Sequence, residues 1–177
     1  MRKYLPEYLY FLPGAIVFLD QYTKFLVRSN LDYLEMWSPW PWLEPYARIW
    51  HWHNTGASFG MFQGMGTVFA ILAAIVSVGL IYYYPRVPKQ DWIMRLALGM
   101  MLAGAMGNLI DRIYQGHVTD FISVGTFAVF NVADSSITVG VIVLFLAFYI
   151  EEKKNKPKLV EGEMIQPVES DTNEASQ

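Results

Sequence analysis

The sequence predicts an all-α membrane protein: four transmembrane helices, with a small extracytoplasmic β-cradle between helices 1 and 2. The first observation is that 54% of the 177 residues are hydrophobic and that they gather in long blocks. Blocks of about 20 apolar residues cross a bilayer core of about 30 Å. The second is that five of the six tryptophans fall between Asn30 and Gly66. Tryptophan concentrates at lipid headgroups, so this segment is expected on the membrane surface.

Composition excludes several classes of function. The formal net charge of -3 argues against a nucleic-acid partner. Because the chain has no cysteine, it has no disulfide, no thiolate metal site and no cysteine nucleophile.

The first predicted span is Tyr8–Val27, preceded by Arg2 and Lys3. A basic start before an apolar run is also typical of a signal peptide. The run ends in DQYTKFLVRSN without a small-x-small cleavage site, so a retained helix is expected. The surface cradle covers about residues 30–66, where YARIWHWHN alternates like a strand before a glycine-bounded turn.

Three further spans follow the cradle. Thr67–Tyr84 carries no charge, and Leu96–Tyr114 is rich in the small residues that suit a bundle interior. Gln115–Ala128 is predicted to be a connection, and the fourth span is Phe130–Ile150. Residues 1–150 therefore form the membrane domain, whereas residues 151–177 are charged, then polar, and are expected to be a disordered tail.

Lysine and arginine in short loops set the orientation of such a protein. They occur at the amino end, in Pro85–Arg95 and after Glu151. Four spans put all three regions, and so both termini, in the cytoplasm. The tryptophan-rich cradle and the loop around Asp120 then face outward.

The most informative stretch is Gly104–Gly140, which is apolar yet rich in polar groups. Ionisable side chains at membrane depth are costly, so they usually mark function. The side chains in question are Asn108, Asp111, Arg112, Asp120, Asn131 and Asp134.

Two of these aspartates, Asp120 and Asp134, are separated by two apolar patches and a glycine. That length allows a turn back, so that the carboxyls meet across a small pocket. Close carboxylates share a proton; one then activates water as a general base while the other polarises a carbonyl. In the alternative interpretation both are helix-end residues, with Asp134 capping the fourth span.

Other polar positions leave two interpretations open. Asp20 and Lys24, four residues apart, form an ion pair near the interface with Lys24 snorkelling, or serve the site. Asn54–Gly60 is a turn, or a place where a substrate backbone approaches. Asn108 and Arg112 bind a substrate carbonyl, or Arg112 pairs with Asp111 or snorkels.

Asp111 is predicted to be a structural partner and is the main competitor for a catalytic role. His51 and His53 alternate as zinc ligands do, but no third ligand lies nearby in the sequence. No metal site is predicted.

Five motifs in order resemble the lipoprotein signal peptidase (signal peptidase II) family. They are DQYTK (20–24), NTGASFG (54–60), GNLIDR (107–112), GHVTDF (116–121) and FNVAD (130–134). The resemblance implies a monomeric aspartic endopeptidase of the bacterial cytoplasmic (inner) membrane, without cofactor or metal. Its partners would be membrane lipid and diacylglyceryl-modified prolipoproteins, cleaved just before the lipidated cysteine.

The resemblance also implies roles for single residues. Asp120 and Asp134 match the catalytic aspartates. The residues that would bind substrate or brace the site are Asp20, Lys24, Asn54, Gly56, Ala57, Asn108, Asp111, Arg112 and Asn131. Ser58 stands where the family commonly has alanine, and the tail after Lys158 lies outside the resemblance.

Two other classes of function are compatible with intramembrane carboxylates. A small proton-coupled transporter would need a polar route across the whole bilayer, and the second span lacks polar residues for one. A membrane scaffold would leave the cluster of Asn, Asp and Arg side chains without a purpose.

Overall fold

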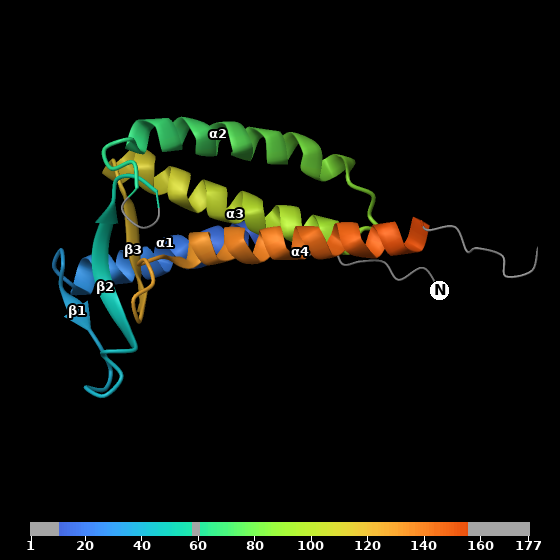
Figure 1. Cartoon of the computed structure of the whole chain (residues 1–177). Coiled ribbons are helices and arrows are strands. Elements are labelled where there is room, and N and C mark those ends of the chain that lie inside the picture. The colour runs from blue at the N-terminus through green and yellow to red at the C-terminus, as the bar shows by residue number, and fades with distance from the viewer. Residues whose placement is uncertain (1–10, 58–60, 156–177) are drawn as a thin grey trace, which may run out of the picture.

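The computed structural model describes residues 11–57 and 61–155. Four long helices lie beside one another, and a three-stranded sheet crosses one end of them (Figure 1). The elements are α1 (Leu12–Asn30), β1 (Met36–Trp37), β2 (Ala47–Asn54), α2 (Gly66–Tyr83), the 3-10 turn η3 (Tyr84–Arg86), α3 (Trp92–Gln115), β3 (Val118–Val124) and α4 (Val132–Asn155).

Helix α3 is the centre of the bundle, because α1, α2 and α4 all pack on it. Its small residues allow close contact, as the sequence predicts. A Cβ at Gly104 would collide with the carbonyl oxygen of Ala133 on α4. A Cβ at Gly107 would lie 2.6 Å from Oδ2 of Asp20 on α1. Small residues at these crossings therefore let polar groups of three helices meet.

Three helices are long and apolar enough to cross a membrane: Gly66–Arg86, Trp92–Gln115 and Val132–Lys153. Within the described residues α1 does not meet this criterion, so the count of four spans stays a prediction. The expected first span, Tyr8–Val27, begins outside the described residues, and α1 continues to Asn30. Helix α2 exposes most of its apolar side chains, as a helix surrounded by lipid does.

The sheet has the order β1-β2-β3, and both pairs are antiparallel. The strand expected before Asn54 is confirmed as β2. Gln115–Ala128 connects α3 to α4, as predicted, but it also contributes β3 to the sheet, which the sequence did not predict. Its sequence VTDFISV is rich in residues that favour strands, and β3 pairs with β2, so that Asp120 lies opposite Trp52.

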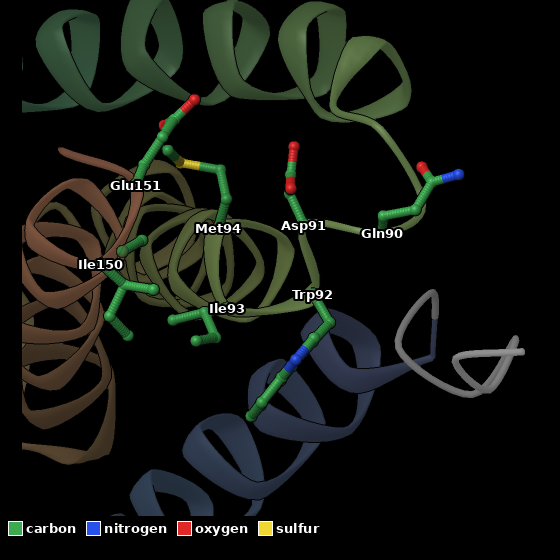
Figure 2. A pocket seen from close by; sticks show the side chains of 8 residues that line it. Gln90, Asp91, Trp92, Ile93, Met94, Ile150 and Glu151 are labelled. Atoms are coloured by element: carbon green, nitrogen blue, oxygen red, sulfur yellow. The ribbon is translucent and has the colours of Figure 1, made fainter. Parts of the chain in front are cut away.

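The opposite end of the bundle gathers the end of α2, the start of α3 and the end of α4 (Figure 1). A pocket lies there, between the start of α3 and the end of α4 (Figure 2). Helix α4 continues to Asn155, past the expected end of the fourth span at Ile150. The tail predicted to be disordered lies, beyond Asn155, outside the described residues.

Candidate active site

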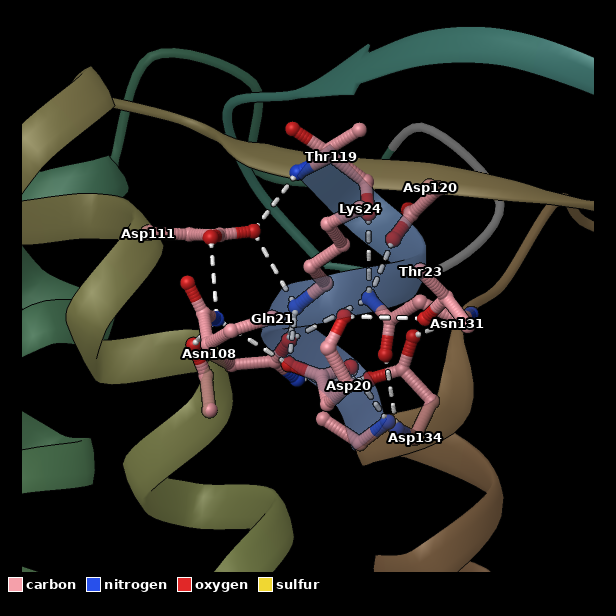
Figure 3. Close-up of polar contacts among 12 residues, drawn as sticks. Asp20, Gln21, Thr23, Lys24, Asn108, Asp111, Thr119, Asp120, Asn131 and Asp134 are labelled. Atoms are coloured by element: carbon pink, nitrogen blue, oxygen red, sulfur yellow. Dashed lines mark hydrogen bonds and ion pairs between the residues drawn. The ribbon is translucent and has the colours of Figure 1, made fainter. Parts of the chain in front are cut away.

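Polar side chains from α1, α3, β3 and α4 meet directly below the sheet, at the ends of the helices (Figure 3). Most of them were predicted from the sequence, although they come from distant parts of the chain. The buried members of the cluster are Asp20, Lys24, Asn108, Asp111, Thr119, Asp120 and Asn131.

Lys24 lies at the centre of the cluster and is 0% exposed. Its Nζ lies 2.9 Å from Oδ2 of Asp20 and 3.0 Å from Oδ2 of Asp111. It also donates to Oδ1 of Asn108 at 3.1 Å. The predicted Asp20–Lys24 ion pair is therefore confirmed, but the prediction that Lys24 extends to the membrane surface was wrong. Two carboxylates and an amide match the three protons of the ammonium, so that Lys24 turns inward.

Asp20 connects α1 to the start of α4. Its second oxygen, Oδ1, accepts a hydrogen bond from the backbone N–H of Ala133 at 2.9 Å. Backbone N–H groups in the first turn of a helix have no partner within the helix. An acidic side chain at this end is also favoured by the helix dipole. Asp20 therefore helps to fix the helix that carries Asp134.

Asp111 ties the end of α3 to β3. Its Oδ2 accepts from the backbone N–H of Thr119 at 3.0 Å, and its Oδ1 lies 3.7 Å from Nη1 of Arg28. Arg28 also donates to the hydroxyl of Thr119 at 3.0 Å. With Lys24 as a further partner, the Asp111 carboxylate is held by two cations and a backbone amide. This arrangement favours a structural role for Asp111.

Asp134 and Asn131 form a reciprocal cap at the start of α4. The backbone N–H of Asp134 donates to Oδ1 of Asn131 at 2.9 Å, and that of Asn131 donates to Oδ2 of Asp134 at 3.2 Å. This is the capping-box arrangement. The other oxygen of Asp134 accepts from Nδ2 of Asn108 at 2.8 Å. Asp134 can therefore cap α4 and also belong to a pair of carboxyls with Asp120, so the two interpretations do not exclude each other.

Asp120 projects from β3 and is 1% exposed. Its Oδ1 accepts from Nδ2 of Asn131 at 2.7 Å, and its Oδ2 accepts from Nδ2 of Asn54 at 2.9 Å. Asn131 thus contacts both candidate catalytic carboxylates. Burial, together with the negative charge of Asp134, raises the pKa of Asp120 to about 7. Near neutral pH this carboxyl can therefore hold or release a proton.

A cavity of about 280 Å³ opens onto Asp120 between β2 and the segment that follows β3. Large aromatic side chains and small residues share its wall. Its lining residues are Trp50, Trp52, Asn54, Ala57, Gln63, Asp120, Phe127, Ala128 and Val129. A buried carboxyl therefore faces a space in which a peptide group and a water molecule fit.

Gly56 and Arg112 lie at the edge of this site. Gly56 donates its N–H to Oδ1 of Asn54, and a Cβ there would collide with the backbone of Met61 and Phe62. The loop's own backbone therefore fills the space that Gly56 leaves. Arg112 donates to the carbonyl oxygen of Gly56 at 3.2 Å. Among the described residues Arg112 forms no salt bridge with Asp111. Asn108 does not accompany Arg112 at the edge of the site, because its side chain points into the cluster and donates to Asp134.

Sequence reasoning missed Gln21, Arg28 and Thr119. The side chain of Gln21 donates to Asp20, to Asp111 and to the carbonyl oxygen of Gly107. A signal was present, because Gln21, Lys24 and Arg28 follow helical spacing along one face of the helix.

The histidines form a separate cluster on the sheet. The rings of His51 and His53 have centroids 5.0 Å apart, and His53 lies 3.7 Å from His117. Burial, together with the positive charges of His117 and His51, lowers the pKa of His53 to about 4. Within the described residues, no group of three or more His, Asp or Glu side chains is arranged to hold a metal ion.

Comparison with known proteins decides the family. The profile of signal peptidase (SPase) II matches residues 12–150. The chain belongs to the signal peptidase II family. The lipoprotein signal peptidase of Halalkalibacterium halodurans is 38% identical over 151 residues, which cover 83% of this chain and 95% of that protein. That of Bacillus subtilis is 36% identical over 151 residues, 83% of this chain and 96% of the relative.

Two solved structures of bacterial membrane enzymes share the fold of this chain. A bacterial membrane enzyme determined at 2.3 Å resolution has a TM-score of 0.78 and 31% identity, covering 90% of this chain and 98% of that one. A second, at 1.9 Å, has a TM-score of 0.71. The chain is therefore a protease of the signal peptidase II family with several apolar helices long enough to cross a membrane.

Proposed function

We propose that this protein is an aspartic endopeptidase that removes signal peptides from diacylglyceryl-modified prolipoproteins, cutting just before the lipidated cysteine. The observation that carries the proposal is that Asn131 hydrogen-bonds both Asp120 and Asp134 beside a cavity. The names of the relatives, lipoprotein signal peptidases, support the substrate class.

The chemistry needs one ionised and one protonated carboxyl. The ionised carboxylate takes a proton from water, whose oxygen attacks the scissile carbonyl carbon. The protonated carboxyl donates its proton to the carbonyl oxygen and so stabilises the tetrahedral intermediate. When the intermediate collapses, the carbon–nitrogen bond breaks. The leaving amine takes the proton that the first carboxyl had accepted from water, and the second carboxylate recovers its proton from a hydroxyl of the intermediate. The raised pKa of Asp120 supports a shared proton at neutral pH.

The depth of the site suits a lipidated substrate. With four spans and both termini in the cytoplasm, the sheet lies on the outer membrane surface. The exposed Trp37 of β1, with Trp40 and Trp42 in the loop between β1 and β2, suits the headgroup level. The acyl chains of the modified cysteine stay in lipid, so the bond beside that cysteine reaches the same level as Asp120 and Asp134.

The signal peptide has an apolar side of the bundle on which to lie. Helices α2 and α4 both pack on α3 and flank it (Figure 1). Their exposed side chains, such as Ile75 and Phe145, are apolar. A substrate helix that enters from the bilayer between α2 and α4 has its cleavage site at the sheet end.

The test is cleavage of a diacylglyceryl-modified prolipoprotein by purified protein in detergent, with a chelator present. Asp120→Asn and Asp134→Asn should each lower the rate about a hundredfold or more, since each removes an acid–base group. The matched control is Asp32→Asn, because Asp32 is an exposed aspartate outside the site. This variant should retain activity. Wild-type rates in either dyad variant would exclude this mechanism.

A further inference from the structure

The pocket at the other end of the bundle has no part in the proposed chemistry. It has a volume of about 250 Å³ and lies between the start of α3 and the end of α4. Met94 and Ile150 give it an apolar wall. Figure 2 shows the carboxylate side chains of Asp91 and Glu151 projecting to the same side, with Met94 between them. That side is the one on which α2 lies.

The two carboxylates have no cation of their own among the described residues, since neither takes part in a salt bridge there. Three cations of this end make other contacts. Arg95 donates to backbone carbonyl oxygens of the preceding loop. Arg86 and Lys153 each lie over a tyrosine ring of their own chain segment. The pocket therefore combines two carboxylates that form no salt bridge among the described residues with an apolar wall.

A lysine or arginine side chain matches this combination. Its aliphatic stem packs on apolar groups while its charged head remains at the polar rim. Signal peptides carry such side chains in a positively charged n-region, which precedes an apolar h-region of about 7–15 residues.

The length of the bundle fits the length of a signal peptide. Glu151 and Asp134 lie on the same helix, α4, about 26 Å apart at a rise of 1.5 Å per residue. A helical h-region spans about 10–22 Å, and a few extended residues at about 3.3 Å each cover the remainder. A signal peptide cut beside Asp134 therefore has its n-region at the depth of this pocket.

We propose that Asp91 and Glu151 form a subsite that binds the positively charged n-region of the signal peptide. This inference rests on the proposed function and adds a specificity determinant at the end of the bundle opposite the dyad. The subsite holds the amino-terminal end of the substrate helix while the active site holds the other end. The scissile bond is thereby presented to Asp120 and Asp134 at the correct depth.

The test compares two substrates and three enzymes. The substrates are one diacylglyceryl-modified prolipoprotein with lysines in its n-region and the same protein with those lysines changed to glutamine. The enzymes are wild type, the double variant Asp91→Asn/Glu151→Gln, and Glu152→Gln. The last is a matched control, because Glu152 neighbours Glu151 but does not line the pocket.

For wild type and for the control, the lysine substrate should have a KM about three- to tenfold lower than the glutamine substrate, as expected for exposed ion pairs. The double variant should lose this difference with kcat unchanged, and salt should weaken it in wild type. Glu151→Lys should instead favour a substrate with glutamates in its n-region over the lysine substrate.

An unchanged lysine preference in the double variant would overturn the subsite while leaving the peptidase proposal intact. An equal change for both substrates would also overturn it, since the pocket would then act through the fold or through the amine headgroup of a lipid. Failure of wild type to cleave either substrate would instead refute the proposed function, and the subsite with it.

Discussion

The side-chain amide of Asn131 donates to Oδ1 of Asp120 at 2.7 Å, joining the residue that caps α4 to β3. The same residue caps α4, since its Oδ1 accepts from the backbone N–H of Asp134. A residue that sequence reasoning placed among the bracing positions thus links the helix to the strand. Its two tasks can be separated by mutation.

Asn131→Ser should keep the helix cap but lose the hydrogen bond to Asp120, whereas Asn131→Ala should lose both. Loss of a cap costs about 1 kcal/mol, so only the alanine variant should unfold at a clearly lower temperature. Both should cleave at least about tenfold more slowly, because a misplaced group costs rate. Thermal unfolding and cleavage rate, measured side by side, provide the check. A serine variant with wild-type activity would show that the Asn131–Asp120 contact is dispensable.

Lys24→Met should destabilise the protein strongly. The lysine is completely buried with Asp20 and Asp111, and its removal leaves two carboxylates without their shared cation. Breaking a buried ion pair on one side typically costs about 3–5 kcal/mol. Chemical unfolding in detergent measures the change. Tyr22→Met, on the exposed side of the same helix, is the control and should change stability by less than about 1 kcal/mol.

The pH dependence of stability should report on Asp120. Its pKa is raised to about 7 in the folded protein, from a usual value of 3.8, so the folded state binds more protons than the unfolded state between these values. The free energy of unfolding contributed by this group therefore falls as pH rises from about 4 to about 7. In Asp120→Asn this part of the slope should vanish, as measured by unfolding at several pH values. An identical slope in both proteins would contradict the raised pKa.

Gly107→Ala should damage both stability and cleavage. A Cβ at this position would lie 2.6 Å from Oδ2 of Asp20 and 3.2 Å from the Cβ of Ala133. The carboxylate of Asp20 must therefore move away, which disturbs its ion pair with Lys24. Gly99→Ala is the matched control on α3, because its nearest neighbour would lie 3.5 Å away, an ordinary contact. The control should be neutral or slightly stabilising, since alanine favours the helix. Cleavage rate and thermal unfolding of the two variants separate the cases.

Local sequence was enough to predict three helices that are long and apolar enough to cross a membrane, and strand β2. Each depends on patterns within some 20 residues: hydrophobic length, side-chain alternation and glycine at turns. The motifs around Asp20, Asn54, Asn108, Asp120 and Asn131 also predicted which polar residues gather. The family resemblance provided their proposed roles, which spacing had left open.

Contacts between distant segments decided the remainder. The direction of Lys24 depends on Asp111 and Asn108, which belong to another helix, and the strand conformation of β3 depends on pairing with β2. Whether a charged side chain turns to water or to the interior depends on its partners there, because burial is tolerated only when each charge and donor is matched. Such partners arise from packing, so the position of Lys24 and the link through Asn131 became visible only in the folded chain.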